Sequence, residues 1–223
     1  MRLTRLFRHL LSGVLYWPRF FASNGGANQG QAAILRVIGN WWLELCVYAL
    51  ECLGVGELYE TTLDLIKFNT RSLHPWEVQL ARSVFGNTIN YRRVRIDERA
   101  FVGPRQKRFC YVSFYMINAW GPMDNALLIH ELVHIWQYER FGAVYMPRAL
   151  AAQRTVMGYD YGGVGRLKLC KDNHFGLQHF NYEQQGDIIA DYYRIREGYK
   201  PVWGIGSRLD LEIYHYFVEQ LKG

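Results

Sequence analysis

The chain has 223 residues, a length that suits one packed domain with an extension, and half of its residues are hydrophobic. Its formal net charge of +6 comes from 26 basic and 20 acidic residues. No internal repeat or low-complexity tract is present, which excludes repeat and low-complexity architectures.

An amphipathic helix is predicted at the N-terminus, within residues 1–18. Its apolar positions follow helical spacing, and Pro18 is expected to end it after about two to four turns. Three interpretations stay open: the helix covers a groove on the same protein, lies on an anionic membrane surface, or is a signal peptide. Polar residues within the apolar run argue against a signal peptide. The apolar residues are Leu3, Leu6, Phe7, Leu10, Leu11, Val14 and Leu15.

A loop rich in Gly and Asn follows at residues 22–30 and is expected to be a flexible linker. Helical patterns come next, and polar residues inside the first of them argue against a membrane span. We therefore divide the chain into a helical N-terminal extension, residues 1–70, and a second domain, residues 71–223. The predicted helices cover residues 31–53, 57–68 and 75–86.

A basic stretch lies between residues 92 and 108. We interpret it as solvated surface, although basic surfaces also bind nucleic acid, anionic lipid or acidic proteins. Nucleic acid is disfavoured because the four cysteines form no C-x-x-C pair for an accompanying zinc ribbon. A single strand is predicted over residues 108–117, which are rich in aromatic and β-branched residues. The basic residues are Arg92, Arg93, Arg95, Arg99, Arg105, Lys107 and Arg108.

Residues 125–138, with the sequence NALLIHELVHIWQY, carry the strongest chemical signal. They are apolar on nearly all sides, which predicts a buried helix, and Asp124 is the expected N-cap. His130 and His134 lie one turn apart on one face, so their imidazoles can bind one Zn²⁺ ion. Glu131 can accept a proton from a water molecule that the metal activates. The alternative, a buried helix with two structural histidines, leaves the buried glutamate without a partner.

A catalytic zinc ion usually has three protein ligands and one open position. A third histidine in the pattern H-E-x-x-H-x-x-G-x-x-H is excluded, because Gln137 and Arg140 occupy the last two required positions. The other known arrangement takes a glutamate from a later helix as the third ligand. His174 and His179 are rival candidates.

A second predicted helix, over residues 181–194, supplies the glutamate that we favour as third ligand. Glu183 and Asp187 share one face of it, four residues apart. Glu183 can bind the metal, and Asp187 can hold the second ring nitrogen of a histidine. Gly186 and Ala190 are small enough to let this helix approach the first one closely. A solvated acidic face is the alternative interpretation of the two carboxylates.

Three stretches of the chain occur in a recognisable combination: Leu80–Tyr91 with Val94–Ile96, Leu128–Gln137, and Tyr182–Tyr193. In this combination the chain resembles the small zinc metallopeptidase domains of bacterial type VI secretion. Those domains occur at the C-terminus of VgrG spike proteins or as free-standing vgr-related proteins. The resemblance leaves the N-terminal extension outside it.

The resemblance implies a function and a set of roles. His130, His134 and Glu183 would bind zinc in a gluzincin-like site, and Glu131 would be catalytic. The strand before the zinc helix would bind an extended peptide substrate. The protein would be made in a bacterial cytoplasm and secreted as an antibacterial effector into the periplasm of a target cell. A VgrG-type spike and a cognate immunity protein would be its partners.

We therefore predict a mainly helical α+β fold of the zincin-like type, with a short sheet. A donor for the developing oxyanion is also expected. Two other function classes stay open: a non-catalytic interaction protein with a structural metal site, and a protein that contacts a membrane surface through residues 1–18. The candidate oxyanion donors are Tyr145, Tyr159, Tyr161, His174 and Arg166.

Overall fold

The structure is a computed structural model that describes residues 2–23, 29–67, 69–101 and 109–222. It is mainly helical with a small mixed sheet, in agreement with the predicted α+β class. The helices are α1 (Arg2–Ser23), α2 (Gln29–Cys52), α3 (Val55–Ile66), α4 (Pro75–Phe85), α6 (Asn125–Phe141), α7 (Tyr145–Gln153), α8 (Gly163–Asp172), α9 (Tyr182–Arg196) and α10 (Leu211–Lys222), with the short 3-10 turns η1 (Leu177–His179) and η2 (Arg208–Asp210). The strands are β1 (Thr70–Ser72), β2 (Arg95–Asp97), β3 (Tyr111–Ser113) and β4 (Met116–Asn118).

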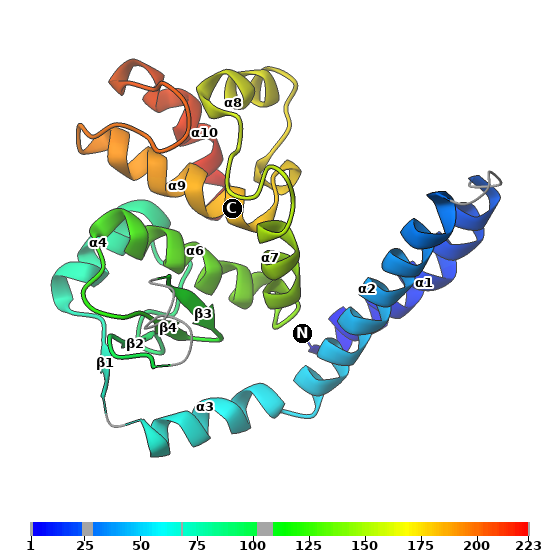
Figure 1. Cartoon of the computed structure of the whole chain (residues 1–223). Coiled ribbons are helices and arrows are strands. Elements are labelled where there is room, and N and C mark those ends of the chain that lie inside the picture. The colour runs from blue at the N-terminus through cyan, green and yellow to red at the C-terminus, as the bar shows by residue number, and fades with distance from the viewer. Residues whose placement is uncertain (1, 24–28, 68, 102–108, 223) are drawn as a thin grey trace.

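Helix α6 runs through the middle of the globular part, with the sheet on one side and α9 and α10 on the other (Figure 1). Its sequence is apolar nearly all round, and residues 128–138 are all buried. The carboxylate of Asp124 accepts a hydrogen bond from Leu127 N at 2.9 Å and caps the helix as predicted. Gly142, at φ 82°, follows its last residue.

Helix α9 begins with a capping box, which fixes where its carboxylates point. The Asn181 side chain accepts hydrogen bonds from the backbone N–H groups of Glu183 and Gln184, and the Gln184 side-chain oxygen accepts one from Asn181 N–H. The helix packs along α6 and is buried over most of its length. Glu183 therefore lies in the first turn of a helix whose start is fixed.

The sheet has the strand order β1-β2-β4-β3, so β3 is its edge strand beside α6. The prediction of one strand over residues 108–117 is wrong, because β3 and β4 form an antiparallel hairpin. Phe114, at φ 58°, makes the turn. Its ring packs on Tyr59 and Tyr138, and the Arg93 guanidinium lies 4.1 Å from the Tyr115 ring centre. Aromatic residues that favour a strand here hold a turn instead.

Helices α1 and α2 pack against each other and extend away from the globular part (Figure 1). Contrary to prediction, α1 continues through Pro18 to Ser23, because contact with α2 offsets the hydrogen bond that a proline removes. The predicted linker is shortened by both helices, and its residues 24–28 lie outside the described part. Within the described residues, no helix has the length and apolar character needed to cross a membrane.

An ion pair and a hydrogen bond from a side chain to the backbone join this helical pair to the globular part. Arg148 of α7 binds both carboxylate oxygens of Glu44 at 2.8 Å. Arg5 of α1 binds Glu51 of α2 at 2.9 Å and also donates to the backbone oxygen of Glu139, near the end of α6.

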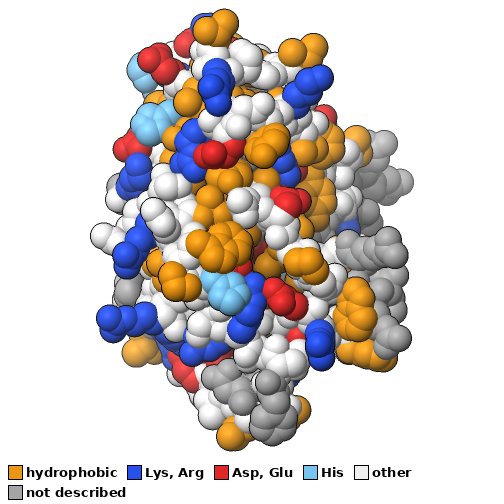
Figure 2. All heavy atoms as spheres, turned by 90° about the vertical axis from the view of Figure 1, so that its left-hand side faces the viewer, with side chains coloured by type: hydrophobic (Ala, Val, Ile, Leu, Met, Phe, Trp, Pro, Cys, Tyr) orange, Lys and Arg blue, Asp and Glu red, His pale blue; other side chains and the backbone are white. Residues whose placement is uncertain are grey.

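The surface charge is mixed on the face that Figure 2 shows. Basic side chains are scattered there among acidic and hydrophobic ones, with no large patch of one sign.

Candidate metal centre

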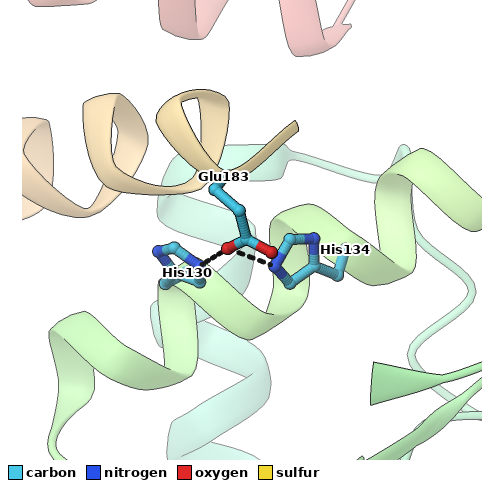
Figure 3. A group of neighbouring side chains, drawn as sticks. All are labelled: His130, His134 and Glu183. Carbon is cyan, nitrogen blue, oxygen red and sulfur yellow. Dashed lines mark hydrogen bonds and ion pairs between the residues drawn. The ribbon is translucent and has the colours of Figure 1, made fainter. Parts of the chain in front are cut away.

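Three side chains from α6 and α9 converge at the centre of the fold. His130 and His134 lie on the same side of α6, and Glu183 reaches from α9 so that its carboxylate lies between the two imidazoles (Figure 3). The Glu183 Oε2 atom is 3.3 Å from His130 Nε2 and 3.4 Å from His134 Nε2. Each residue offers one atom able to bind a metal, these three atoms lie within 4.8 Å of one another, and all three residues are buried. Among the described residues this is a group able to hold a metal ion.

The close approach of α9 to α6 depends on Gly186. A Cβ atom at this position would lie 2.5 Å from Cε1 of the His130 ring and 2.7 Å from Nδ1. No real Cβ atom comes so close to a ring, so a larger residue would have to move the imidazole or the helix. The sequence prediction that small residues permit this approach therefore has a direct structural reason at Gly186.

We expect Gly186→Ala to weaken metal binding by about 10–100-fold, the loss typical of a displaced or unsupported ligand. The measurement is competition for Zn²⁺ with a chromophoric chelator. Gly165→Ala is the matched control, since this helical glycine of α8 has nothing within 4 Å of an added Cβ. An affinity in Gly186→Ala equal to that of the unmodified protein would show that the site does not need this approach.

Each histidine is oriented by a hydrogen bond at its other ring nitrogen. His130 Nδ1 lies 2.8 Å from Asp187 Oδ1, and His134 Nδ1 lies 2.8 Å from Gln137 Oε1. Because both partners are acceptors, a neutral ring keeps its proton on Nδ1, and Nε2 is then the nitrogen that can bind a metal. Asp187 thus lies where the sequence prediction put it.

Three glutamines that no sequence motif singled out support the cluster. Gln137, fully buried, donates to the Tyr182 carbonyl and to Gln185 Oε1, each at 2.9 Å. Gln153 of α7 donates to the second oxygen of Glu183 at 2.9 Å. One signal was available for Gln137: an uncharged polar residue three positions after His134, on a helix predicted to be buried.

Charges in the cluster are strongly coupled. Burial lowers the pKa of His130, but hydrogen bonds with Asp187 and Glu183 outweigh burial and raise it to about 10. Burial raises the pKa of Glu183, yet its hydrogen bonds with His130 and His134 lower it well below the usual range. The metal-free cluster therefore holds protons near a carboxylate, and a cation has to displace them in order to bind.

Glu131 is a buried carboxylate beside the cluster of His130, His134 and Glu183 but not part of it. It is 4% exposed, and its Oε2 atom has no hydrogen-bond partner among the described residues. Burial raises its pKa. A carboxylate held in this way beside a metal site has the environment of a general base.

The cluster opens into a cleft of about 270 Å³. One wall is the edge strand β3, and α7 forms part of the other. The two imidazoles and the carboxylates of Glu131, Glu183 and Asp187 line it. Apolar side chains that line the cleft are Phe109, Val112, Leu127, Met146, Ala149 and Leu150.

Two of the predicted oxyanion donors line this cleft. The Tyr145 hydroxyl donates to the Val112 carbonyl at 2.6 Å, so its proton is already engaged. Tyr159 is partly exposed, and its ring centre lies 6.0 Å from that of His130. Burial, and then the negative charges of Glu183 and Glu131, raise the pKa of Tyr159 and keep its hydroxyl protonated. Tyr159 therefore lies in the cleft beside His130 in the protonated form, which can donate a hydrogen bond.

The other predicted donors lie elsewhere. Tyr161 is buried outside the cleft, where its hydroxyl binds Asp191 and Tyr214, each at 2.8 Å. His174 is an exposed residue after α8, and the Arg166 guanidinium lies over the Phe180 ring. His174 and the rival ligand His179 are not in the metal-binding group of the described residues.

The fold and cluster thus define a buried site of two histidines from α6 and one glutamate from α9, able to hold a metal ion. The chain is 30% identical over 136 residues to the type VI secretion system spike protein VgrG2b of Pseudomonas aeruginosa. That match covers 55% of this chain but only 13% of the spike protein, and it links the chain to VgrG-related type VI secretion proteins. No known family profile matches the chain. No solved structure is significantly similar to it.

Proposed function

We propose that the chain is a zinc-dependent, gluzincin-like metallopeptidase with a zincin-like fold. The observation that carries the proposal is the convergence of His130 Nε2, His134 Nε2 and a Glu183 oxygen, with separations of 3.3 and 3.4 Å from the carboxylate. A tetrahedral zinc site with bonds of about 2.0–2.1 Å separates its ligand atoms by roughly 3.3–3.4 Å. Two nitrogens and one carboxylate oxygen also match the ligands of catalytic zinc, which keeps a fourth position open.

The proposed roles of the side chains follow from their surroundings. When bound, zinc would polarise the peptide carbonyl and make a water molecule more acidic. Glu131 would accept the proton of the attacking water and pass it to the leaving amine, which its buried position and raised pKa favour. Tyr159 would donate a hydrogen bond to the developing oxyanion. Strand β3 would bind the peptide in extended form along the cleft.

The match to a spike protein supports a role in type VI secretion. We propose that the protein is made in a bacterial cytoplasm and associates with a VgrG-type spike. It would then act as an antibacterial effector in the periplasm of a target cell. Peptides or proteins there would be its substrates, and the producing cell would need a cognate immunity protein.

A peptide-library experiment tests the peptidase proposal. The purified full-length protein is incubated with unstructured peptides, and new termini are identified by mass spectrometry. We expect new termini that disappear after chelation and return when Zn²⁺ is added back. A library left intact by the zinc-loaded protein would count against peptidase activity.

Exposed apolar side chains favour a second candidate, a secretion-associated interaction protein whose metal is structural. Leu3 and Phe7 of α1 are 74% and 63% exposed. Leu53, just before α3, is 79% exposed, and Leu58 of α3 is 67% exposed. Each of these side chains offers apolar area that a partner could cover. In this case chelation would unfold the protein, and no cleavage would be found under any condition.

A further inference from the structure

Helix α9 carries three carboxylates along one face, at intervals of four residues. Glu183 is the first and Asp187 the second, and both point to the histidines. The third, Asp191, is completely buried and turns toward a different segment. It accepts hydrogen bonds from the backbone nitrogens of Val202 and Trp203, at 2.8 and 3.2 Å. The loop after α9 is thereby folded back onto the helix that supplies a metal ligand.

Trp203 reaches the metal centre from this loop. Its Nε1–H donates to Asp187 Oδ2, while Asp187 Oδ1 lies 2.8 Å from His130 Nδ1. Each oxygen of the carboxylate therefore has one partner, the indole on one side and the imidazole on the other. The Asp187 side chain is only 14% exposed, so water competes little for these bonds.

The backbone of Trp203 is held at both its nitrogen and its carbonyl oxygen. Asp191 binds its nitrogen, and the Tyr161 hydroxyl approaches its carbonyl oxygen at 3.4 Å. The next residue, Gly204 at φ 79°, lies against Gly163: a Cβ on Gly204 would be 3.0 Å from the Gly163 Cα. The indole is thus placed by the fold before any metal binds.

We propose that Trp203 is a positioning residue of the metal centre. By fixing the Asp187 carboxylate it sets the ring orientation of His130 and keeps the proton on Nδ1, so that Nε2 faces the metal position. Asp191 and Tyr161 hold the loop that makes this contact. The inference rests on the metal site of the proposed function and does not need peptidase activity.

Trp203→Phe tests the proposal, because it removes the N–H donor and keeps an aromatic ring. We expect Zn²⁺ affinity, measured by chelator competition, to fall about 10–100-fold. Trp136→Phe is the matched control: it removes another indole hydrogen bond, 3.0 Å from Nε1 to the Leu221 carbonyl, on the α6 side away from the cluster. The control should stay within about twofold of the unmodified protein. Equal affinity in Trp203→Phe and the unmodified protein would overturn the proposal.

A double-mutant cycle separates positioning from a general structural effect. In an Asp187→Ala background, Trp203→Phe should cause no further loss of affinity, since the indole acts through that carboxylate. A full additional loss would overturn the proposal while leaving the metal site in place. Should Trp203→Phe fold poorly, benzothienylalanine at position 203 provides the same test, because it has the shape of tryptophan without the N–H. Absence of Zn²⁺ binding in the unmodified protein would overturn both this inference and the proposed function.

Discussion

Glu131→Gln should abolish most peptide cleavage and leave zinc binding intact. The Glu131 carboxylate lines the cleft beside the histidines, and one of its oxygens has no hydrogen-bond partner among the described residues. Glutamine has nearly the same shape but cannot accept the proton of an attacking water. General acid–base catalysis contributes roughly 10²–10⁴-fold, so kcat/KM should fall by about that factor.

The comparison for Glu131→Gln is Glu139→Gln, on the same helix. Glu139 accepts a hydrogen bond from Asn90 N at 2.9 Å and lies outside the cleft. This control should keep full activity and full zinc content. Zinc content of Glu131→Gln should also match that of the unmodified protein, because the residue is not among the three proposed metal ligands. Cleavage by Glu131→Gln at a rate close to normal would remove Glu131 from the mechanism.

Zinc should strongly stabilise protein from which a chelator has removed the metal. At free zinc 1,000-fold above Kd, linkage predicts about 4 kcal/mol of added unfolding free energy. For a protein of this size that corresponds to a rise in Tm of roughly 8–16 °C by thermal unfolding. His134→Ala removes one of three ligands and should abolish the rise. His179→Ala, outside the cluster, should keep the rise in Tm. A rise that survives in His134→Ala and is lost in His179→Ala would show that the metal binds elsewhere.

This stabilisation should weaken as the pH falls. The pKa of His130 is raised to about 10 by Asp187 and Glu183, against the effect of burial, so the metal-free protein holds this proton throughout the neutral range. Zinc must displace the proton, and the displacement becomes more costly at lower pH. The zinc-induced rise in Tm should therefore be smaller at pH 6 than at pH 8. A rise independent of pH would show that no histidine proton is displaced.

The helices α6 and α9, and their packing against each other, could be predicted from the sequence. The spacing of His130 and His134 defines one face of a helix, and Glu183 with Asp187 defines the face of another. Both patterns depend only on helical periodicity, which local sequence determines. The small side chain at Gly186 indicated that the helices approach each other.

The proposed oxyanion donor could not be chosen in the same way. Tyr159 and Tyr161 are two residues apart in an irregular segment, between Gly158 at φ 51° and Gly162 at φ 84°. One ring faces the cleft and the other is buried against Asp191. No periodicity predicts such directions, because they depend on backbone angles that glycine permits.

Trp203 was beyond prediction for a related reason. It lies 16 residues after Asp187 and is brought back by a loop that Asp191 anchors. The hairpin at Phe114 and the continuation of α1 through Pro18 were missed because tertiary contacts outweighed local preference.

The most direct test of the account is the elemental metal content of purified full-length protein, with Glu183→Ala measured beside it. We expect about one zinc ion per chain in the unmodified protein and little in the variant, because three side chains converge on one position. Unmodified protein without bound metal, even after Zn²⁺ has been supplied, would contradict the proposed metal centre and the peptidase function that depends on it.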